Sequence, residues 1–91
     1  MINYRPNKGS FNESIKHTKI FNTLDEMFEH IESMWNHTKT MPLIQKEHLC
    51  VTHSLGRDMR TGWNDYRYVY TTQIGDELYD VPQCVAVCSI E

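Results

Sequence analysis

The sequence predicts an α+β fold in which one amphipathic helix packs on a small antiparallel sheet of three or four strands. Two observations lead to this prediction: a helical repeat of bulky apolar residues follows residue 22, and several later segments have the composition of strands. The later segments are joined by short connections, which favour antiparallel pairing because a parallel pair needs a crossover of a dozen or more residues. The 91 residues are expected to form one domain in the order strand, helix, strand, strand, strand.

The helix is the clearest element of the sequence. Thr23 and Glu26 have the spacing of a capping box, in which the Thr hydroxyl accepts a hydrogen bond from the backbone N–H three residues later. The helix is expected to end near residues 38–40, because the residue before Pro42 avoids helical backbone. Its apolar stripe consists of Leu24, Met27, Phe28, Ile31, Met34 and Trp35.

The first strand is expected over residues 14–21, where Lys16 and Lys19 protect an exposed sheet edge. Residues 1–12 precede it without periodicity, and their content of Asn, Pro, Lys, Gly and Ser is typical of irregular chain. They are therefore expected to form a flexible or irregular N-terminal arm of the domain.

The other strands are expected at residues 47–55, 63–74 and 81–90. In the second of them Tyr66, Tyr68 and Tyr70 recur at every other position, so their side chains are expected on one face of the sheet. The three tyrosines therefore form a row on that face.

The last strand is apolar on both faces, which is typical of a central or covered strand. Simple alternation places Val85 and Val87 on one face and Cys84, Ala86 and Cys88 on the other. This strand is therefore expected in the interior of the sheet.

Composition and charge limit the classes of function. The net charge of −3 and the isoelectric point of 5.9 argue against a nucleic-acid partner, because general nucleic-acid binders carry a basic face. No segment approaches the roughly 20 apolar residues of a membrane span. Three cysteines are an odd number for a disulfide framework, and free thiols suit a reducing compartment, so a cytoplasmic location is expected.

Histidine and cysteine are the usual zinc ligands, but their spacing in this sequence does not build a metal site. Cys84 and Cys88 are four residues apart on a predicted strand, which separates them by about 13 Å, too far to share one ion. His48 and Cys50 share a strand face without a second pair of ligands. No metal ion and no other cofactor is therefore expected.

An enzyme or a ligand-binding protein is the first alternative function. Cys50 lies between His48 and His53, which brings a nucleophile and candidate bases into one segment. However, His53 is expected on the opposite strand face, and the chain contains no glycine-rich elbow or phosphate loop. The alternative rests on residues 48–53 or on the Arg/Trp loop 57–67, and no catalytic residue is assigned.

The segment 56–70 (GRDMRTGWNDYRYVY) is the predicted contact surface. Arg, Trp and Tyr are enriched at interface hot spots, because each combines a large contact area with a polar group. We predict a non-enzymatic interaction domain, a regulatory accessory protein that binds another protein or a second copy of itself. Its predicted partner-binding residues are Arg57, Asp58, Arg60, Trp63, Tyr66, Tyr68 and Tyr70.

The same segment also has a purely structural interpretation. Trp63 then anchors the core at the start of a strand, and Asp58 pairs with an arginine to brace the loop. The tyrosines then form one half-exposed face of the sheet. The burial of these side chains decides between the two interpretations.

Mimicry of nucleic acid is a further alternative, in which carboxylates imitate phosphates and block the basic groove of a nucleic-acid enzyme. Acidic side chains line the outer face of the predicted helix and recur in a later loop. These residues are Asp25, Glu26, Glu29, Glu32, Asp76, Glu77 and Asp80.

Overall fold

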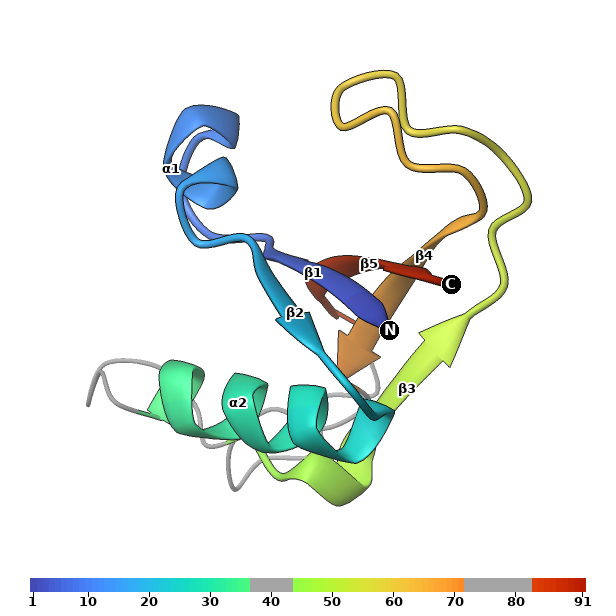
Figure 1. Cartoon of the computed structure of the whole chain (residues 1–91). Coiled ribbons are helices and arrows are strands. Elements are labelled where there is room, and N and C mark those ends of the chain that lie inside the picture. Colours follow the sequence, from blue (N-terminus) through green and yellow to red (C-terminus); the bar gives the residue numbers. More distant parts are fainter. Residues whose placement is uncertain (37–43, 72–82) are drawn as a thin grey trace.

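The computed structural model describes residues 1–36, 44–71 and 83–91, which form a five-stranded antiparallel sheet and one main helix. The strands lie in the order β2-β1-β5-β4-β3, so β5 is the central strand (Figure 1). The predicted α+β class is confirmed, and the sheet has one strand more than expected. The elements in chain order are β1 (Ile2–Pro6), α1 (Phe11–Ile15), β2 (Lys19–Phe21), α2 (Leu24–Asn36), the short 3₁₀ helix η1 (Lys46–His48), β3 (Leu49–Thr52), β4 (Tyr66–Thr71) and β5 (Gln83–Ile90).

Strand β1 forms from residues 2–6, in place of the flexible or irregular arm expected for residues 1–12. It pairs with β2 on one side and with β5 on the other, so it lies inside the sheet. Ile2 and Tyr4 are buried in the core, and Arg5 is also buried, with 8% of its surface exposed. Pro6 ends the strand, where its missing N–H breaks the hydrogen-bond ladder least.

The strand expected over residues 14–21 is confined to β2. Ser10 caps α1, because its side chain accepts a hydrogen bond from the N–H of Glu13. This cap draws Ser14 and Ile15 into the helix. Only the last three residues of the expected strand then remain to pair with β1.

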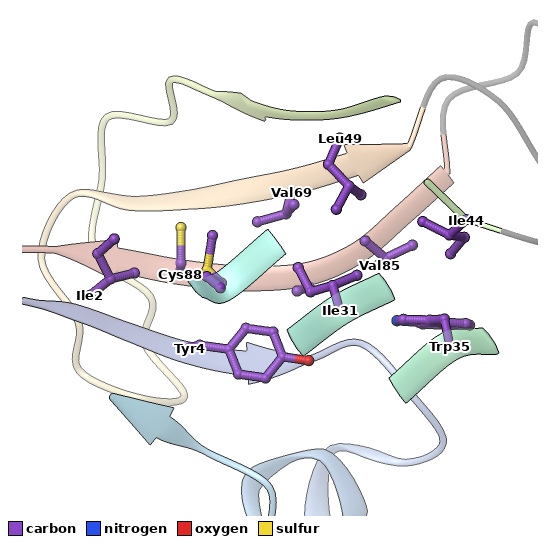
Figure 2. Packing of buried hydrophobic residues seen from close by; sticks show 11 residues of the cluster. Ile2, Tyr4, Ile31, Trp35, Ile44, Leu49, Val69, Val85 and Cys88 are labelled. Carbon is purple, nitrogen blue, oxygen red and sulfur yellow. The ribbon is translucent and has the colours of Figure 1, made fainter. Parts of the chain in front are cut away.

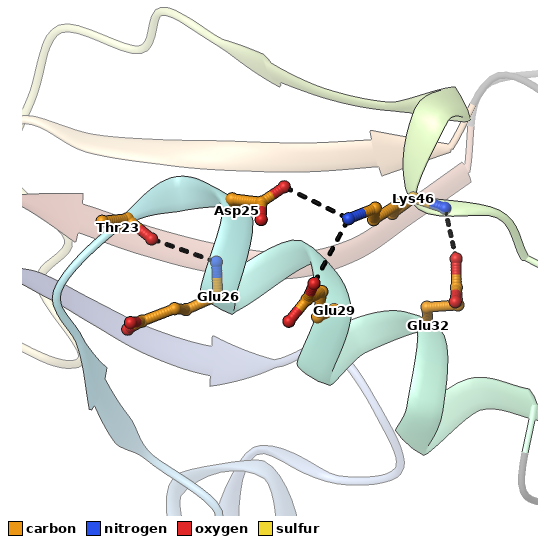
Figure 3. Close-up of polar contacts among 6 residues, drawn as sticks. All are labelled: Thr23, Asp25, Glu26, Glu29, Glu32 and Lys46. Atoms are coloured by element: carbon orange, nitrogen blue, oxygen red, sulfur yellow. Dashed lines mark hydrogen bonds and ion pairs between the residues drawn. The ribbon is translucent and has the colours of Figure 1, made fainter.

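Helix α2 begins as predicted. The hydroxyl of Thr23 accepts a hydrogen bond of 3.2 Å from the N–H of Glu26 (Figure 3). The Glu26 carboxylate accepts a hydrogen bond of 3.1 Å from the N–H of Asn22. The second bond reaches one residue further back than in the usual capping box. The expected end of the helix near residues 38–40 lies outside the described residues.

The apolar stripe of α2 faces the sheet. Met27, Ile31 and Trp35 are buried, and Figure 2 shows Ile31 and Trp35 directed toward Val85 of β5. Phe28 and Met34 are partly buried against the same core, whereas Leu24 in the first turn is 37% exposed. Each fully buried side chain of this size contributes roughly 1.5–3 kcal/mol, so the stripe holds helix and sheet together.

A bulge in β5 changes which of its residues share a face. Val69 pairs with Ala86, but the next residue, Tyr70, pairs with Cys84, which leaves Val85 as the extra residue. Val85 and Ala86 therefore both belong to the helix-side core. The simple alternation predicted for this strand is wrong at this point.

The bulge leaves the two C-terminal cysteines on opposite faces of the sheet. Cys84 lies opposite Tyr70, whereas Cys88 lies opposite Tyr4 in the core. Val87 and Ser89 share the face of Cys84, since side chains directly opposite each other in an antiparallel pair lie on the same face. Helix α2 covers the other face (Figure 1).

Among the described residues, none of the helices has the length and apolar character needed to cross a membrane.

Candidate functional site

The tyrosine face, formed by Tyr66, Tyr68 and Tyr70 of β4, lies on the side of the sheet opposite α2. The ring centroids of the first two are 5.4 Å apart at an interplanar angle of 88°, and those of the last two are 6.1 Å apart at 51°. All three side chains are half-buried. The predicted alternation is confirmed, and the rings form one continuous row with part of each surface open to solvent.

The cross-strand neighbours of the three tyrosines are smaller side chains of the central strand β5. Tyr66 lies opposite Ser89, Tyr68 opposite Val87 and Tyr70 opposite Cys84. A hydrogen bond between the Tyr66 and Tyr68 side chains is the main cause that raises the pKa of Tyr68, and burial adds to the effect. Tyr68 therefore keeps its proton at neutral pH and remains a hydrogen-bond donor.

The loop between β3 and β4 is folded back on itself beside this face. Arg57 forms an isolated bridge with Asn64, and the N–H of Asp58 donates to the carbonyl of Trp63 at 2.9 Å. The turn closes with a hydrogen bond of 2.7 Å from the N–H of Gly62 to the carbonyl of Asp58. Gly62 has a φ of +74°, which favours glycine. The loop therefore holds its arginines in a defined arrangement.

The arginine hollow is a depression of about 420 Å³ between this loop and the tyrosine face. It brings together five of the seven predicted partner-binding residues with one residue that the sequence did not single out, Arg5 of β1. The residues that define it are Arg5, Arg57, Asp58, Arg60, Tyr66 and Tyr68.

Arg5 is the buried centre of the arginine hollow. Its Nη2 atom lies 3.5 Å from Oδ2 of Asp58, and its guanidinium carbon lies 4.9 Å from the centre of the Phe11 ring. The guanidinium of Arg60 lies 5.4 Å from the same ring. The predicted pairing of Asp58 with an arginine occurs, but the arginine comes from β1 and so ties the loop to the sheet.

The Nε atom of Arg5 is buried and has no hydrogen-bond partner among the described residues. A buried donor left unpaired costs about 1–3 kcal/mol. Both Asp58 oxygens are already engaged, since Oδ1 accepts from the N–H of Arg60 at 2.9 Å and Oδ2 faces Arg5. Neither Asp58 oxygen is therefore bonded to Nε, which keeps an unused hydrogen-bond donor beside the hollow.

Trp63 and Tyr70 lie apart from the arginine hollow. Trp63 is half-buried before β4 begins and lines a separate hollow with Ser89 and Ile90, so it is not the core anchor considered from the sequence. Tyr70 extends the row of rings beyond the hollow. The seven predicted residues therefore occupy neighbouring regions rather than one pocket.

Arg5 is absent from the predicted site because residues 1–12 are expected from the sequence to form a flexible or irregular arm. The alternation of Ile2 and Tyr4 with Asn3 and Arg5 is a strand signal, but it covers only two periods before Pro6. Its counter-ion, Asp58, is distant in the sequence. Only the fold brings them together.

The histidine and cysteine candidates do not form a cluster with metal-binding geometry. Among residues 1–36, 44–71 and 83–91, no group of three or more His, Cys, Asp or Glu side chains is close enough to hold an ion. His48 lies in η1 rather than on the strand, and Cys50 and His53 are exposed. Burial raises the pKa of Cys84, and it raises that of Cys88 to about 11, so both remain neutral thiols.

The acidic residues of α2 have a structural role at its outer face. Lys46 Nζ lies 3.4 Å from Asp25 and 3.3 Å from Glu29, and its backbone N–H donates to Glu32 at 2.7 Å (Figure 3). These contacts hold η1 against the helix. The other acids considered for mimicry, at positions 76, 77 and 80, lie outside the described residues.

A second groove, of about 490 Å³, lies between α1, β2 and α2. Pro6, His17, His30 and Met34 are among the residues that line it. Burial lowers the pKa of His30, and the nearby Lys19 adds to the effect. The imidazole is therefore neutral at physiological pH and lies against the Tyr4 and Phe21 rings.

The arginine hollow and the tyrosine face are thus the candidate site. Comparison of the chain with protein-family models, with curated proteins and with solved structures finds no match.

Proposed function

We propose that this chain is a non-enzymatic interaction domain, a regulatory accessory to a protein partner, and that the partner docks on the tyrosine face and the adjoining arginine hollow. The observation that carries the proposal is the row of half-exposed, mutually contacting rings of Tyr66, Tyr68 and Tyr70 on the sheet face that α2 does not cover. Such a face offers rigid aromatic area at a small cost in side-chain entropy.

The charge of the hollow supports a partner with acidic character. Its lining includes Arg5, Arg57 and Arg60 and one carboxylate, that of Asp58, so the charged side chains of the lining sum to a net +2. The whole chain carries −3, so this positive region contrasts with the rest of the molecule. Opposite charge across an interface speeds association and excludes wrong partners.

The same charge disfavours a second copy of the chain as the occupant. A two-fold symmetric dimer buries the same patch on both copies, which would bring two positive hollows together. Like charges facing each other across an interface are costly. A different protein is therefore the proposed partner, and self-association is the competing outcome.

A cytoplasmic location is part of the proposal. The three cysteines Cys50, Cys84 and Cys88 are free thiols. Cys88 is buried in the core, so a protein that docks on the tyrosine face does not reach it. Free thiols persist in a reducing compartment.

Site-specific photo-crosslinking tests the proposal. Tyr68 is replaced by p-benzoylphenylalanine in cells that naturally make the protein, and the control places the same group at Ser33, which is exposed on α2. We expect one dominant covalent adduct at position 68 and none at position 33. Equal adducts at both positions, or none at position 68, contradict the proposal, and an adduct with the chain itself favours the dimer.

The adduct identifies a partner whose binding is then measured with purified proteins. Tyr68→Glu is expected to weaken the affinity by about tenfold or more, because it buries a charge in the contact. Ser33→Glu adds the same charge on α2 and is expected to leave the affinity within about twofold. Circular dichroism of both variants checks that the fold is intact.

A further inference from the structure

The arginine hollow has the properties of a site for a doubly charged oxyanion. Three arginines and one carboxylate line it, and neither Arg57 nor Arg60 forms an ion pair with another described residue. Both are exposed at the rim, whereas Arg5 forms the buried floor. The net charge of +2 exceeds what a single carboxylate would neutralise.

The Arg5 side chain at the floor of the hollow is held by contacts with its neighbours. Only 10% of the Arg5 side chain is exposed, and its guanidinium contacts both the Phe11 ring and the Asp58 carboxylate. Asp58 is itself fixed by the N–H of Arg60. The unpaired Nε of this buried guanidinium is a donor held in place without an acceptor.

The guanidinium groups of Arg5 and Arg60 both contact the ring of Phe11. The guanidinium groups of Arg5 and Arg60 lie 4.9 Å and 5.4 Å from the centre of the Phe11 ring. Their mutual repulsion is relieved when an anion binds between the loop and the sheet. Planar guanidinium groups match phosphate oxygens in pairs of parallel hydrogen bonds.

From these observations we propose that the arginine hollow binds a phosphomonoester carried by a side chain of the protein partner. A phosphorylated side chain carries a charge of about −1.5 to −2 at neutral pH, which matches the lining. The adjoining Tyr66 and Tyr68 offer hydroxyl groups and ring surface to the residue that bears the phosphate. The source of the phosphate rests on the function proposed above, whereas the anion site stands on its own geometry.

An NMR titration with phenyl phosphate tests the anion site without any partner. The signal of the Arg5 Nε–Hε group is followed, because this buried atom lacks an acceptor in the free protein. We expect a saturable shift, and a dissociation constant about fivefold or more larger in the double variant Arg57→Gln, Arg60→Gln. Both residues are exposed, so the fold survives these changes where Arg5→Gln risks unfolding.

Two controls sharpen the titration. Lys16→Gln removes an exposed cation that caps the C-terminus of α1 and does not line the hollow, and it is expected to change the affinity by less than about twofold. Benzoate, a single negative charge on the same ring, is expected to bind several times more weakly than phenyl phosphate. The proposal is overturned if phenyl phosphate causes no saturable shift. It is also overturned if benzoate binds as tightly as phenyl phosphate, or if Lys16→Gln weakens binding as much as the double variant does.

Phosphatase treatment of the free partner, which the crosslink identifies and which is purified from the same cells, tests the source of the phosphate. We expect the treatment to weaken binding to the native chain by about tenfold, and to have little effect on the double variant. Unchanged binding after treatment overturns the phosphorylated partner. Because the titration uses no partner, its result is independent of whether crosslinking at position 68 captures a protein.

Discussion

The Nη2 atom of Arg5 lies 3.5 Å from the Oδ2 atom of Asp58, and only 10% and 12% of the two side chains are exposed. This ion pair joins β1 to the loop before β4. It also sets the floor of the arginine hollow, so the stability of the loop and the charge of the candidate site depend on the same contact.

Asp58→Asn is expected to lower the free energy of unfolding by about 3 kcal/mol, because it leaves a buried guanidinium without its counter-ion. The asparagine oxygen can still accept the hydrogen bond from the N–H of Arg60, so the turn is preserved. Urea denaturation followed by circular dichroism measures the change. Glu13→Gln, which removes the exposed pair with Lys16, is expected to cost less than about 0.5 kcal/mol. Equal effects of the two substitutions would show that the Arg5–Asp58 pair has no special role.

How far the sequence predicts this fold depends on how local each signal is. The cap of α2 and its apolar stripe both lie between Thr23 and Trp35, so the pattern of this short segment is enough to predict them. The tyrosine row follows from alternation within β4 alone. These features need no knowledge of the rest of the chain.

The missed features depend on partners far away in the sequence. β1 is a strand because β5 pairs with it, and the two lie at opposite ends of the chain. The bulge at Val85 appears only when β5 is aligned with β4. Five of the six residues that define the arginine hollow follow from the sequence because they lie in one segment, whereas Arg5 reaches the hollow only through the fold.

Ile31→Ala is expected to lower the free energy of unfolding by about 3 kcal/mol, because Ile31 is fully buried between α2 and the sheet and its loss leaves a cavity. Leu24→Ala, at the exposed end of the same stripe, is expected to cost less than about 1 kcal/mol. Thermal or urea denaturation compares the two. Similar losses for both variants would mean that the helix does not dock on the sheet through the residues assigned to it.

Stability is expected to fall as the pH rises from about 9 to about 11. Burial raises the pKa of Cys88 from its ordinary value of 9.0 to about 11, so the unfolded chain loses this proton first. Below pH 9 both states are protonated and the full stability is present. Between pH 9 and pH 11 the free energy of unfolding is expected to fall by on the order of 2–3 kcal/mol, since each pKa unit corresponds to about 1.4 kcal/mol.

Cys88→Ala isolates this alkaline effect. The variant loses some packing at every pH, but its stability is expected to decline less steeply between pH 9 and 11 than that of the native chain. Urea denaturation at several pH values measures both slopes. Burial also raises the pKa of Tyr4, so part of the decline persists in the variant. An identical slope in the two proteins would assign the whole effect to other groups.

The central claim is that the partner covers the tyrosine face and the arginine hollow. Hydrogen–deuterium exchange of the free chain and of its complex with the partner captured at position 68 tests it most directly. The expected result is slower exchange in peptides that cover residues 56–71, with no change in those that cover α2 at residues 24–36. Slower exchange confined to α2, with residues 56–71 unchanged, would contradict the claim.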